Sequence, residues 1–167
     1  GGKPLPTGRY DIVLDGEAAA SLVEVIGELF LAPAIHKNRS FLKGKLGEHV
    51  ASRALTLTDD GLLKRGLGAS PFDGEGVPRA KTPLLTEGTA AGWLYNLKYA
   101  LIDGVKSTGN GSRSLSGTPD ADTTNLVLEP GAATLEELFR QAGNGIYVTE
   151  LLGFHTLNPV SGEFSIG

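Results

Sequence analysis

The sequence predicts an α+β domain, in which a mixed or antiparallel sheet packs with a few helices. Hairpin-like pairs of strand segments alternate with single helical segments, rather than following the strict strand–helix repeat of a doubly wound sheet. The 167 residues correspond to about one domain. The 24 glycines, about twice the usual share, separate segments without any internal repeat.

The N-terminal part begins with a predicted linker over residues 1–8, which contains two prolines, followed by a single domain over residues 9–167. Residues 10–14 are expected to form a strand. Asp15 is a suitable N-cap for a helix over residues 16–30. Apolar residues recur there at helical spacing, and Pro33 is expected to end the helix.

The next part is predicted to contain a short second helix over residues 40–50, although Gly44 and Gly47 weaken it. Residues 54–58 have the character of a strand, and Asp59-Asp60-Gly61 that of a turn. Residues 61–77 are expected to form a long ordered loop.

A hairpin is the clearest feature of the middle of the chain. Residues 81–86 and 89–95 are strand-like and flank Glu87-Gly88. Trp93 and Tyr95 would share one face of the second strand, where a role in the core is favoured over ligand stacking. A helix over residues 96–102 is expected to stop at Gly104.

The C-terminal part starts with a segment rich in Ser, Gly, Thr and Asp over residues 107–122, which is either disordered or a binding loop. A strand is expected over residues 125–128. Thr134 and Glu137 have the spacing of a capping box for a helix that ends at Gly143. A strand over residues 145–152 and a turn over residues 158–162 follow.

Composition excludes several classes of function. The net charge of −4 argues against bulk nucleic-acid binding, and no apolar run is long enough to span a membrane. Basic residues do gather within residues 36–49, where they form either a solvated face or a contact for phosphate or an acidic peptide. The absence of cysteine excludes disulfides, thiol nucleophiles and cysteine-based zinc sites within this chain.

Asp73 and Glu75 are the best candidates for chemistry. They lie in Pro71-Phe72-Asp73-Gly74-Glu75-Gly76-Val77-Pro78, a loop shaped by alternating glycines between two prolines. The two acids could share a cation or act as acid and base. Alternatively, both could accept hydrogen bonds from backbone N–H groups or pair with Arg79 or Lys81.

Other catalytic patterns are incomplete. No two of the three histidines have zinc-ligand spacing, and His155, in a loop-like stretch, is the best candidate among them for a functional role. Gly109-Asn110-Gly111-Ser112 is rich in glycine but has no strand before it and no clear helix after it, so it is a weak phosphate-binding candidate. The sequence also has no Gly-x-Ser-x-Gly elbow around a serine.

Taken together, several segments resemble the TldD/PmbA family, described as modulators of DNA gyrase and as metalloprotease-related. The segments are, in order, Arg39–Glu48, Phe72–Pro78, Lys106–Asn110, Thr124–Gly131, Val148–Gly153 and Asn158–Ser165. Their order and spacing match from about Gly8 to the end of the chain. The form Phe-Asp-Gly-Glu-Gly-Val-Pro is similar to the PmbA (TldE) branch.

The resemblance implies the β-rich C-terminal domain of a longer protein, without that protein's final segment. It also implies a cytoplasmic zinc-dependent peptidase assembly that acts on unfolded peptides. The zinc ligands of the TldD branch, a His-Glu-x-x-x-His helix and a cysteine, would lie outside this chain. No cofactor is therefore expected here, although zinc can be present in the full complex.

On this view the chain is a non-catalytic domain that contributes a dimer interface and a substrate cleft, with a TldD-like subunit or a second copy as partner. Nucleic acid and membrane are not expected partners. Candidate cleft or interface residues, with none catalytic and none binding metal, are Asp73, Glu75, Thr108, Asn110, Arg113 and His155. The alternatives are a self-sufficient homodimeric metallopeptidase with zinc ligands outside this chain, and an acid/base hydrolase centred on Asp73 and Glu75.

Overall fold

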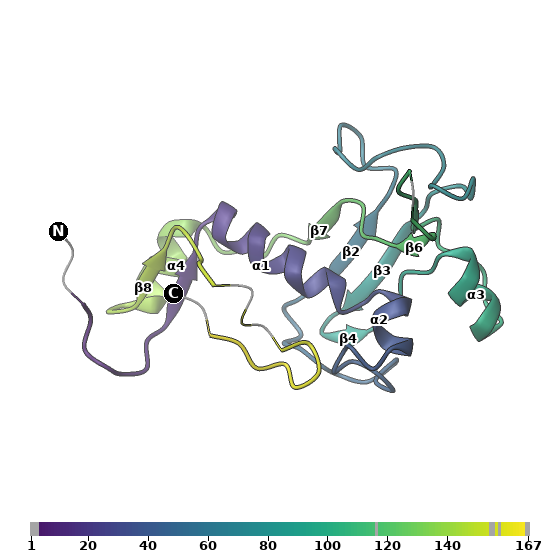
Figure 1. Ribbon diagram of the computed structural model, residues 1–167. Helices are drawn as coiled ribbons and strands as arrows, with labels where there is room; N and C mark the ends of the chain where they lie inside the picture. Colours follow the sequence, from purple (N-terminus) through teal and green to yellow (C-terminus); the bar gives the residue numbers. More distant parts are fainter. Residues whose placement is uncertain (1–3, 116, 154–155, 157, 166–167) are drawn as a thin grey trace.

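The computed structural model describes residues 4–115, 117–153, 156 and 158–165. A four-stranded antiparallel sheet lies at one end of the molecule and a smaller group of elements at the other, with one long helix between them (Figure 1). Single helices pack around an antiparallel sheet, as predicted for an α+β fold.

The main sheet has the strand order β4-β3-β2-β7. The bounds of these strands are β2 Leu57–Asp60, β3 Lys81–Thr86, β4 Thr89–Ala90 and β7 Leu126–Leu128. The turn at Glu87-Gly88 joins β3 to β4, and both residues have positive φ angles of 46° and 76°. A two-residue turn with this geometry matches the twist of the flanking strands, which confirms the predicted hairpin.

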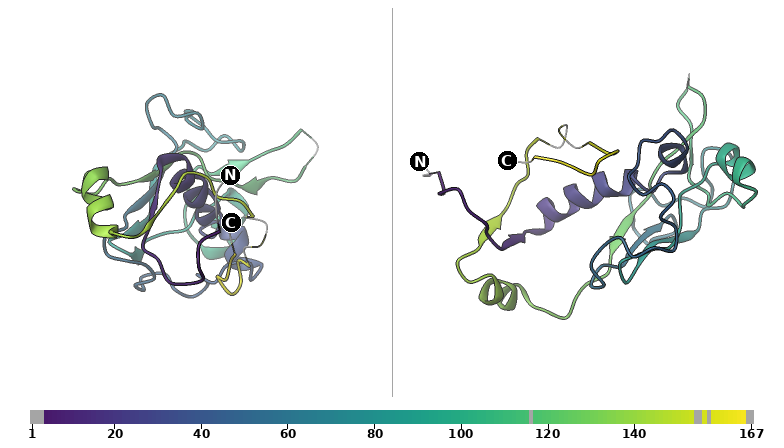
Figure 2. Two further views of the ribbon diagram at one scale, coloured as in Figure 1. Left: turned by 90° about the vertical axis from the view of Figure 1, so that its left-hand side faces the viewer. Right: turned by 90° about the horizontal axis from the view of Figure 1, so that it is seen from below.

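Helix α1, Gly16–Glu28, runs from the smaller group of elements to the main sheet (Figure 2). Asp15 caps it, because its Oδ1 accepts a hydrogen bond of 2.9 Å from the amide of Ala18. The helix lies close against β7 at Gly27, where an added Cβ would stand 2.4 Å from the Cδ1 of Leu126.

A single hydrophobic cluster holds α1, the following turn and the sheet together. Phe30, Leu84 and Leu94 are almost fully buried at its centre, and the Phe30 and Trp93 rings lie 5.8 Å apart. Trp93 therefore belongs to the core, as predicted, although it lies beyond the end of the hairpin strand. Burial of this kind supplies most of the favourable free energy of folding.

Two shorter helices and a small hairpin extend the main body. Helix α2, Ala32–His36, follows α1, and helix α3, Leu97–Asp103, begins after its N-cap Asn96 and ends at Gly104, which has a φ of 67°. Strands β5, Gly111–Ser112, and β6, Asp120–Ala121, form a hairpin within the predicted loop over residues 107–122.

We call the group at the opposite end of α1 the distal unit. It consists of strand β1, Ile12–Leu14, strand β8, Ile146–Val148, and helix α4, Leu135–Ala142. β1 and β8 pair in parallel. The predicted capping box is present, because Thr134 Oγ1 accepts from the amide of Glu137 and the Glu137 carboxylate accepts from the amide of Thr134.

The predictions for residues 33–50 were wrong. Pro33 does not end the helical region but stands in the first turn of α2, where proline costs no backbone hydrogen bond. Residues 40–50 form turns rather than a helix. Gly44 and Gly47 have φ angles of 78° and 82°, so they leave the helical region of backbone conformation.

The predicted boundaries of two strands were also wrong. Asp59 and Asp60 belong to β2 rather than to a turn, and β2 begins at Leu57 rather than at residue 54. The second hairpin strand, β4, ends at Ala90 rather than at residue 95. After β4, Leu94 instead forms an isolated parallel bridge with Leu31, next to the C-terminal end of α1.

Candidate functional site: a junction of two glycine-rich loops

The structure brings together the two glycine-rich segments that the sequence singled out. The loop over residues 71–78 lies against residues 107–113, and backbone hydrogen bonds connect them directly. The amide of Gly74 donates to the carbonyl oxygen of Gly111 over 2.8 Å. We call this contact region the loop junction.

Asp73 is the central acid of the loop junction and is only 8% exposed. Its Oδ1 accepts hydrogen bonds of 2.9 Å from the amides of Glu75 and Val77, within its own loop. Its Oδ2 accepts a 2.7 Å bond from the amide of Gly111, across the junction. One buried carboxylate therefore fixes the shape of its loop and attaches it to the second segment.

Glu75 connects the same loop to a different element. Its Oε2 accepts a 2.8 Å hydrogen bond from the amide of Leu97, the first residue of α3. A negative charge at this end of a helix is favourable because backbone N–H groups there lack partners within the helix. Both acids thus accept backbone N–H donors, which was one of the arrangements that the sequence left open.

The junction requires glycine at position 109. Gly109 has a φ of 75°, and an added Cβ would stand 2.4 Å from the carbonyl oxygen of Pro78. Arg79 reinforces this close approach, because its Nη1 donates to the carbonyl oxygen of Gly109 over 3.0 Å and its Nε donates to Ser70 Oγ over 2.8 Å. Arg79 therefore contacts the backbone of the second loop rather than the carboxylates of Asp73 or Glu75.

Thr108 and Asn110 form a buried network behind the junction. Thr108 Oγ1 accepts a 2.8 Å bond from the amide of Tyr95 and lies 2.7 Å from Asn110 Oδ1. Asn110 Nδ2 in turn donates to Asp59 Oδ2 over 2.7 Å, and Asn110 is 2% exposed. The two candidate residues hold the second loop against the sheet.

Asp59 was missed as a site residue because the sequence indicated a turn there. Its side chain is 1% exposed, and besides Asn110 it accepts bonds from the amide and the hydroxyl of Thr124, at 2.6 and 2.9 Å. A buried carboxylate needs such donors to offset the loss of its hydration. The only hint in the sequence was an acid directly after the strand-like residues 54–58.

Arg113 lies just after β5 and is exposed. Its backbone amide would lie 3.0 Å from a Cβ at Gly74, so the arginine stands directly beside the Asp73 loop. Phe72, 56% exposed, is the apolar residue of the same loop. The junction thus presents one cationic and one aromatic side chain on a rigid backbone. His155 lies outside the described residues.

A second polar cluster was not predicted. His36 Nε2 lies 2.8 Å from Asp103 Oδ1, and the hydroxyl of Tyr95 donates to Asp103 Oδ2 over 2.9 Å. Partial burial opposes ionisation of Asp103, but the hydrogen bonds from His36 and Tyr95 outweigh it and lower the pKa of Asp103. Burial, followed by the hydrogen bond to Asp103 and its charge, raises the pKa of Tyr95.

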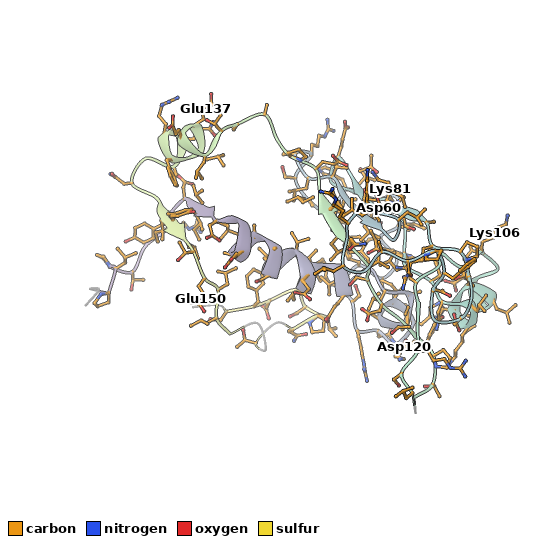
Figure 3. The ribbon with its side chains drawn as sticks, turned by 90° about the horizontal axis from the view of Figure 1, so that it is seen from above. Asp60, Lys81, Lys106, Asp120, Glu137 and Glu150 are labelled. Carbon is orange, nitrogen blue, oxygen red and sulfur yellow. The ribbon has the colours of Figure 1, made fainter. Side chains whose placement is uncertain are left out.

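The charged side chains are spread over the whole surface. Asp60 and Lys81, which are paired in register between β2 and β3, lie side by side in Figure 3, whereas Glu137 is on the distal unit.

Within the described part of the chain, no group of three or more His, Cys, Asp or Glu side chains could hold a metal ion. No helix in that part is long and apolar enough to cross a membrane.

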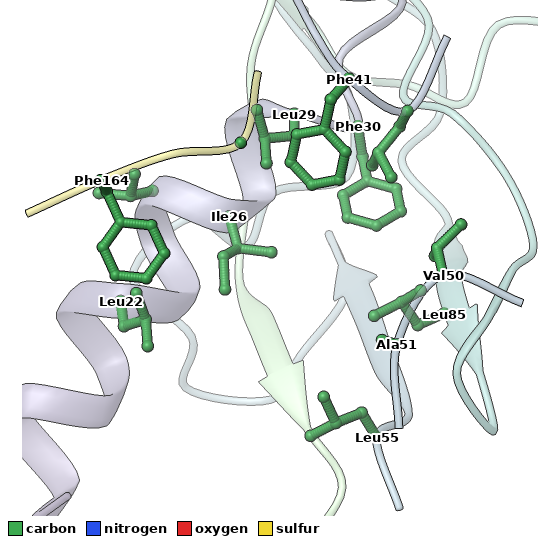
Figure 4. A pocket seen from close by; sticks show the side chains of 13 residues that line it. Leu22, Ile26, Leu29, Phe30, Phe41, Val50, Ala51, Leu55, Leu85 and Phe164 are labelled. Carbon is green, nitrogen blue, oxygen red and sulfur yellow. The ribbon is translucent and has the colours of Figure 1, made fainter. Parts of the chain in front are cut away.

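An apolar pocket of about 250 Å³ lies between α1 and the sheet. Figure 4 shows Leu22 and Ile26 of α1 on one side, with the ring of Phe164 from the C-terminal segment beside them. The full lining is Leu22, Val25, Ile26, Leu29, Phe30, Phe41, Leu42, Val50, Ala51, Leu55, Leu85, Gly162 and Phe164.

Residues 7–167 match a protein family described as "PmbA/TldA metallopeptidase C-terminal domain". The chain belongs to this family. The finding confirms the resemblance that the sequence segments indicated, and with it the predicted type of fold.

Individual relatives agree. A metalloprotease from Methanothermobacter thermautotrophicus is 34% identical over 87% of this chain and 32% of its own length. A proposed modulator of a DNA gyrase from Thermotoga maritima has 38% identity and a TM-score of 0.89, over 98% of this chain and 37% of that one. TldE from Thermococcus kodakarensis has 32% identity and a TM-score of 0.76, over 85% of this chain and 33% of that one. The chain spans about a third of the length of the curated relatives it matches.

Proposed function

We propose that this chain is a non-catalytic domain of a PmbA/TldD-type peptidase subunit that works in the cytoplasm. In this proposal, residues 9–167 form the C-terminal domain of a longer protein and residues 1–8 lead into it. The domain contributes a dimer interface and one wall of a cleft for unfolded peptides. The partner is a TldD-like subunit or a second copy, and zinc is held outside this chain.

The arrangement of Asp73 carries the proposal. A general acid or base must reach a proton of the substrate. The Asp73 carboxylate is buried and accepts three backbone N–H bonds, at 2.7–2.9 Å. It is therefore engaged in fixing the backbone of two loops, which suits a rigid wall better than it suits proton transfer.

The exposed side chains of the loop junction fit the same role. Arg113 and Phe72 stand on segments that Asp73, Arg79 and Gly109 hold in place. Arginine and aromatic residues are enriched where proteins recognise each other, and preorganised loops lose little conformational entropy on binding. We assign to these two residues the contact with a partner subunit or with a passing peptide.

The test is co-purification of the full-length protein with its TldD-type partner, followed by assays of casein cleavage with zinc for each subunit alone and for the pair. The proposal predicts that the two proteins associate and that this protein alone is inactive. If the two proteins fail to associate while this protein alone cleaves casein with zinc, the self-sufficient homodimeric peptidase replaces the proposal.

A variant separates assembly from chemistry within this chain. Arg113→Ala removes an exposed side chain of the junction and should weaken co-purification while leaving the fold intact. Arg140→Ala, on the exposed helix α4 of the distal unit, is the matched control and should co-purify like the wild type. Equal association of both variants would remove Arg113 from the interface.

A further inference from the structure

The strand pair of the distal unit is incomplete as a sheet. β1 and β8 have three residues each, and within the described residues they form a sheet of only two strands. Two parallel strands alone are not independently stable, and parallel strands are normally buried inside larger sheets. The pair therefore has the form of a fragment of a larger sheet.

Apolar side chains occupy both faces of this pair. The register aligns Val13 with Tyr147 on one face, and α4 covers that face through the contact of Phe139 with Tyr147, whose rings are 5.0 Å apart. The opposite face carries Ile12, Leu14, Ile146 and Val148. Ile12 is 60% exposed, which is unfavourable for an isolated strand in water.

Among the described residues, no third strand pairs with the outer edge of β1. On the side that faces β8, the carbonyl oxygen of Asp11 accepts a hydrogen bond from the amide of Ile146. The amide of Asp15 donates to the carbonyl oxygen of Val148. Because backbone groups alternate along a strand, those of Ile12 and Leu14 point to the other side. Strand edges that face solvent usually carry a charge, a proline or a bulge, and the Ile-Val-Leu sequence of β1 includes neither a charge nor a proline.

We propose that a third β-strand, supplied by the part of the polypeptide outside these 167 residues, pairs with the outer edge of β1. We assign the third strand to this part of the polypeptide because the curated relatives are about three times as long as the region that they share with this chain. The added strand covers the backbone groups of Ile12 and Leu14 and brings apolar side chains over the exposed face of Ile12. The distal unit is then the place where the rest of the protein is attached.

Hydrogen exchange of the full-length protein tests this pairing directly. The Leu14 amide should exchange at least about 100-fold more slowly than an exposed amide, at every protein concentration. Exchange of Leu14 at the rate of an exposed amide would overturn the proposal. Protection that appears only at high concentration would assign the edge to a second copy, and protection only with added partner or peptide would assign it to that molecule; either result also overturns it.

Proline substitutions provide an independent readout in the same protein. Ile12→Pro removes an N–H of the outer edge and no hydrogen bond to β8, and it also fixes the φ angle at position 12, whereas Ile12→Ala only shortens the side chain. The proposal predicts that Ile12→Pro lowers the melting temperature several degrees more than Ile12→Ala does. Val13→Pro removes an N–H that faces β8 and should be destabilising in any case. Equal melting temperatures for the two Ile12 variants would show that the edge is open.

Discussion

The loop junction depends on one hydrogen bond that can be measured by itself. In Asp73→Asn, Oδ1 still accepts from Glu75 and Val77, but an amide nitrogen can replace Oδ2 opposite the Gly111 amide, at 2.7 Å. Two donors then face each other in a site that is 8% exposed. Losing a hydrogen bond to a charged, buried group costs about 2 kcal/mol.

This cost converts into a rate of hydrogen exchange. Each 1.4 kcal/mol is a factor of ten in an equilibrium constant, so the Gly111 amide of Asp73→Asn should exchange about 30-fold faster than in the wild type. Asp11→Asn removes an exposed carboxylate just before β1 and should leave the exchange rate of the Gly111 amide unchanged. If Gly111 exchanges at the wild-type rate in Asp73→Asn, the junction is not held by this bond.

Three further outcomes follow from the same structure. Gly109→Ala should unfold at a much lower urea concentration than Gly76→Ala, since both have positive φ but only Gly109 meets backbone atoms; equal midpoints would refute the close contact. Because the pKa of Asp103 is lower in the folded protein than its ordinary value of 3.8, this carboxylate stabilises the fold above pH 3.8, and the stabilisation is lost as the pH falls through the pKa of the folded state. Urea titrations at several pH values should therefore show a smaller loss of stability in acid for Asp103→Asn than for the wild type. The raised pKa of Tyr95 means that stability falls above pH 10.0, where the unfolded tyrosine ionises first; Tyr95→Phe should reduce this fall, and an unchanged alkaline profile would contradict the buried hydroxyl.

Local signals in the sequence were sufficient for several elements. Asp15 and Thr134 are N-caps that bond backbone amides within three residues, so α1 and α4 could be located from short stretches, and Gly104 marked the end of α3 in the same way. The two-residue turn at Glu87-Gly88 predicted the hairpin for the same reason. These features depend on neighbours along the chain, which the sequence displays directly.

Features that depend on distant residues could not be predicted. Asp59 is stable inside β2 because Asn110 and Thr124, 51 and 65 positions away, donate to its carboxylate. The sequence alone shows Asp-Asp-Gly, which is typical of a turn. The 38-residue separation between Asp73 and Gly111 likewise left the role of this acid open until the two loops were seen in contact.

The central claim is that the loop junction serves assembly and the cleft wall rather than bond cleavage. Its most direct test is the kinetics of peptide hydrolysis by the complex of this protein, carrying Glu75→Gln, with the TldD-type partner that the proposal assigns to it. Glutamine Oε1 can still accept the hydrogen bond from Leu97, so the account predicts a wild-type kcat and an intact complex. Loss of hydrolysis, with folding and partner binding preserved, would contradict the account and identify Glu75 as a catalytic residue.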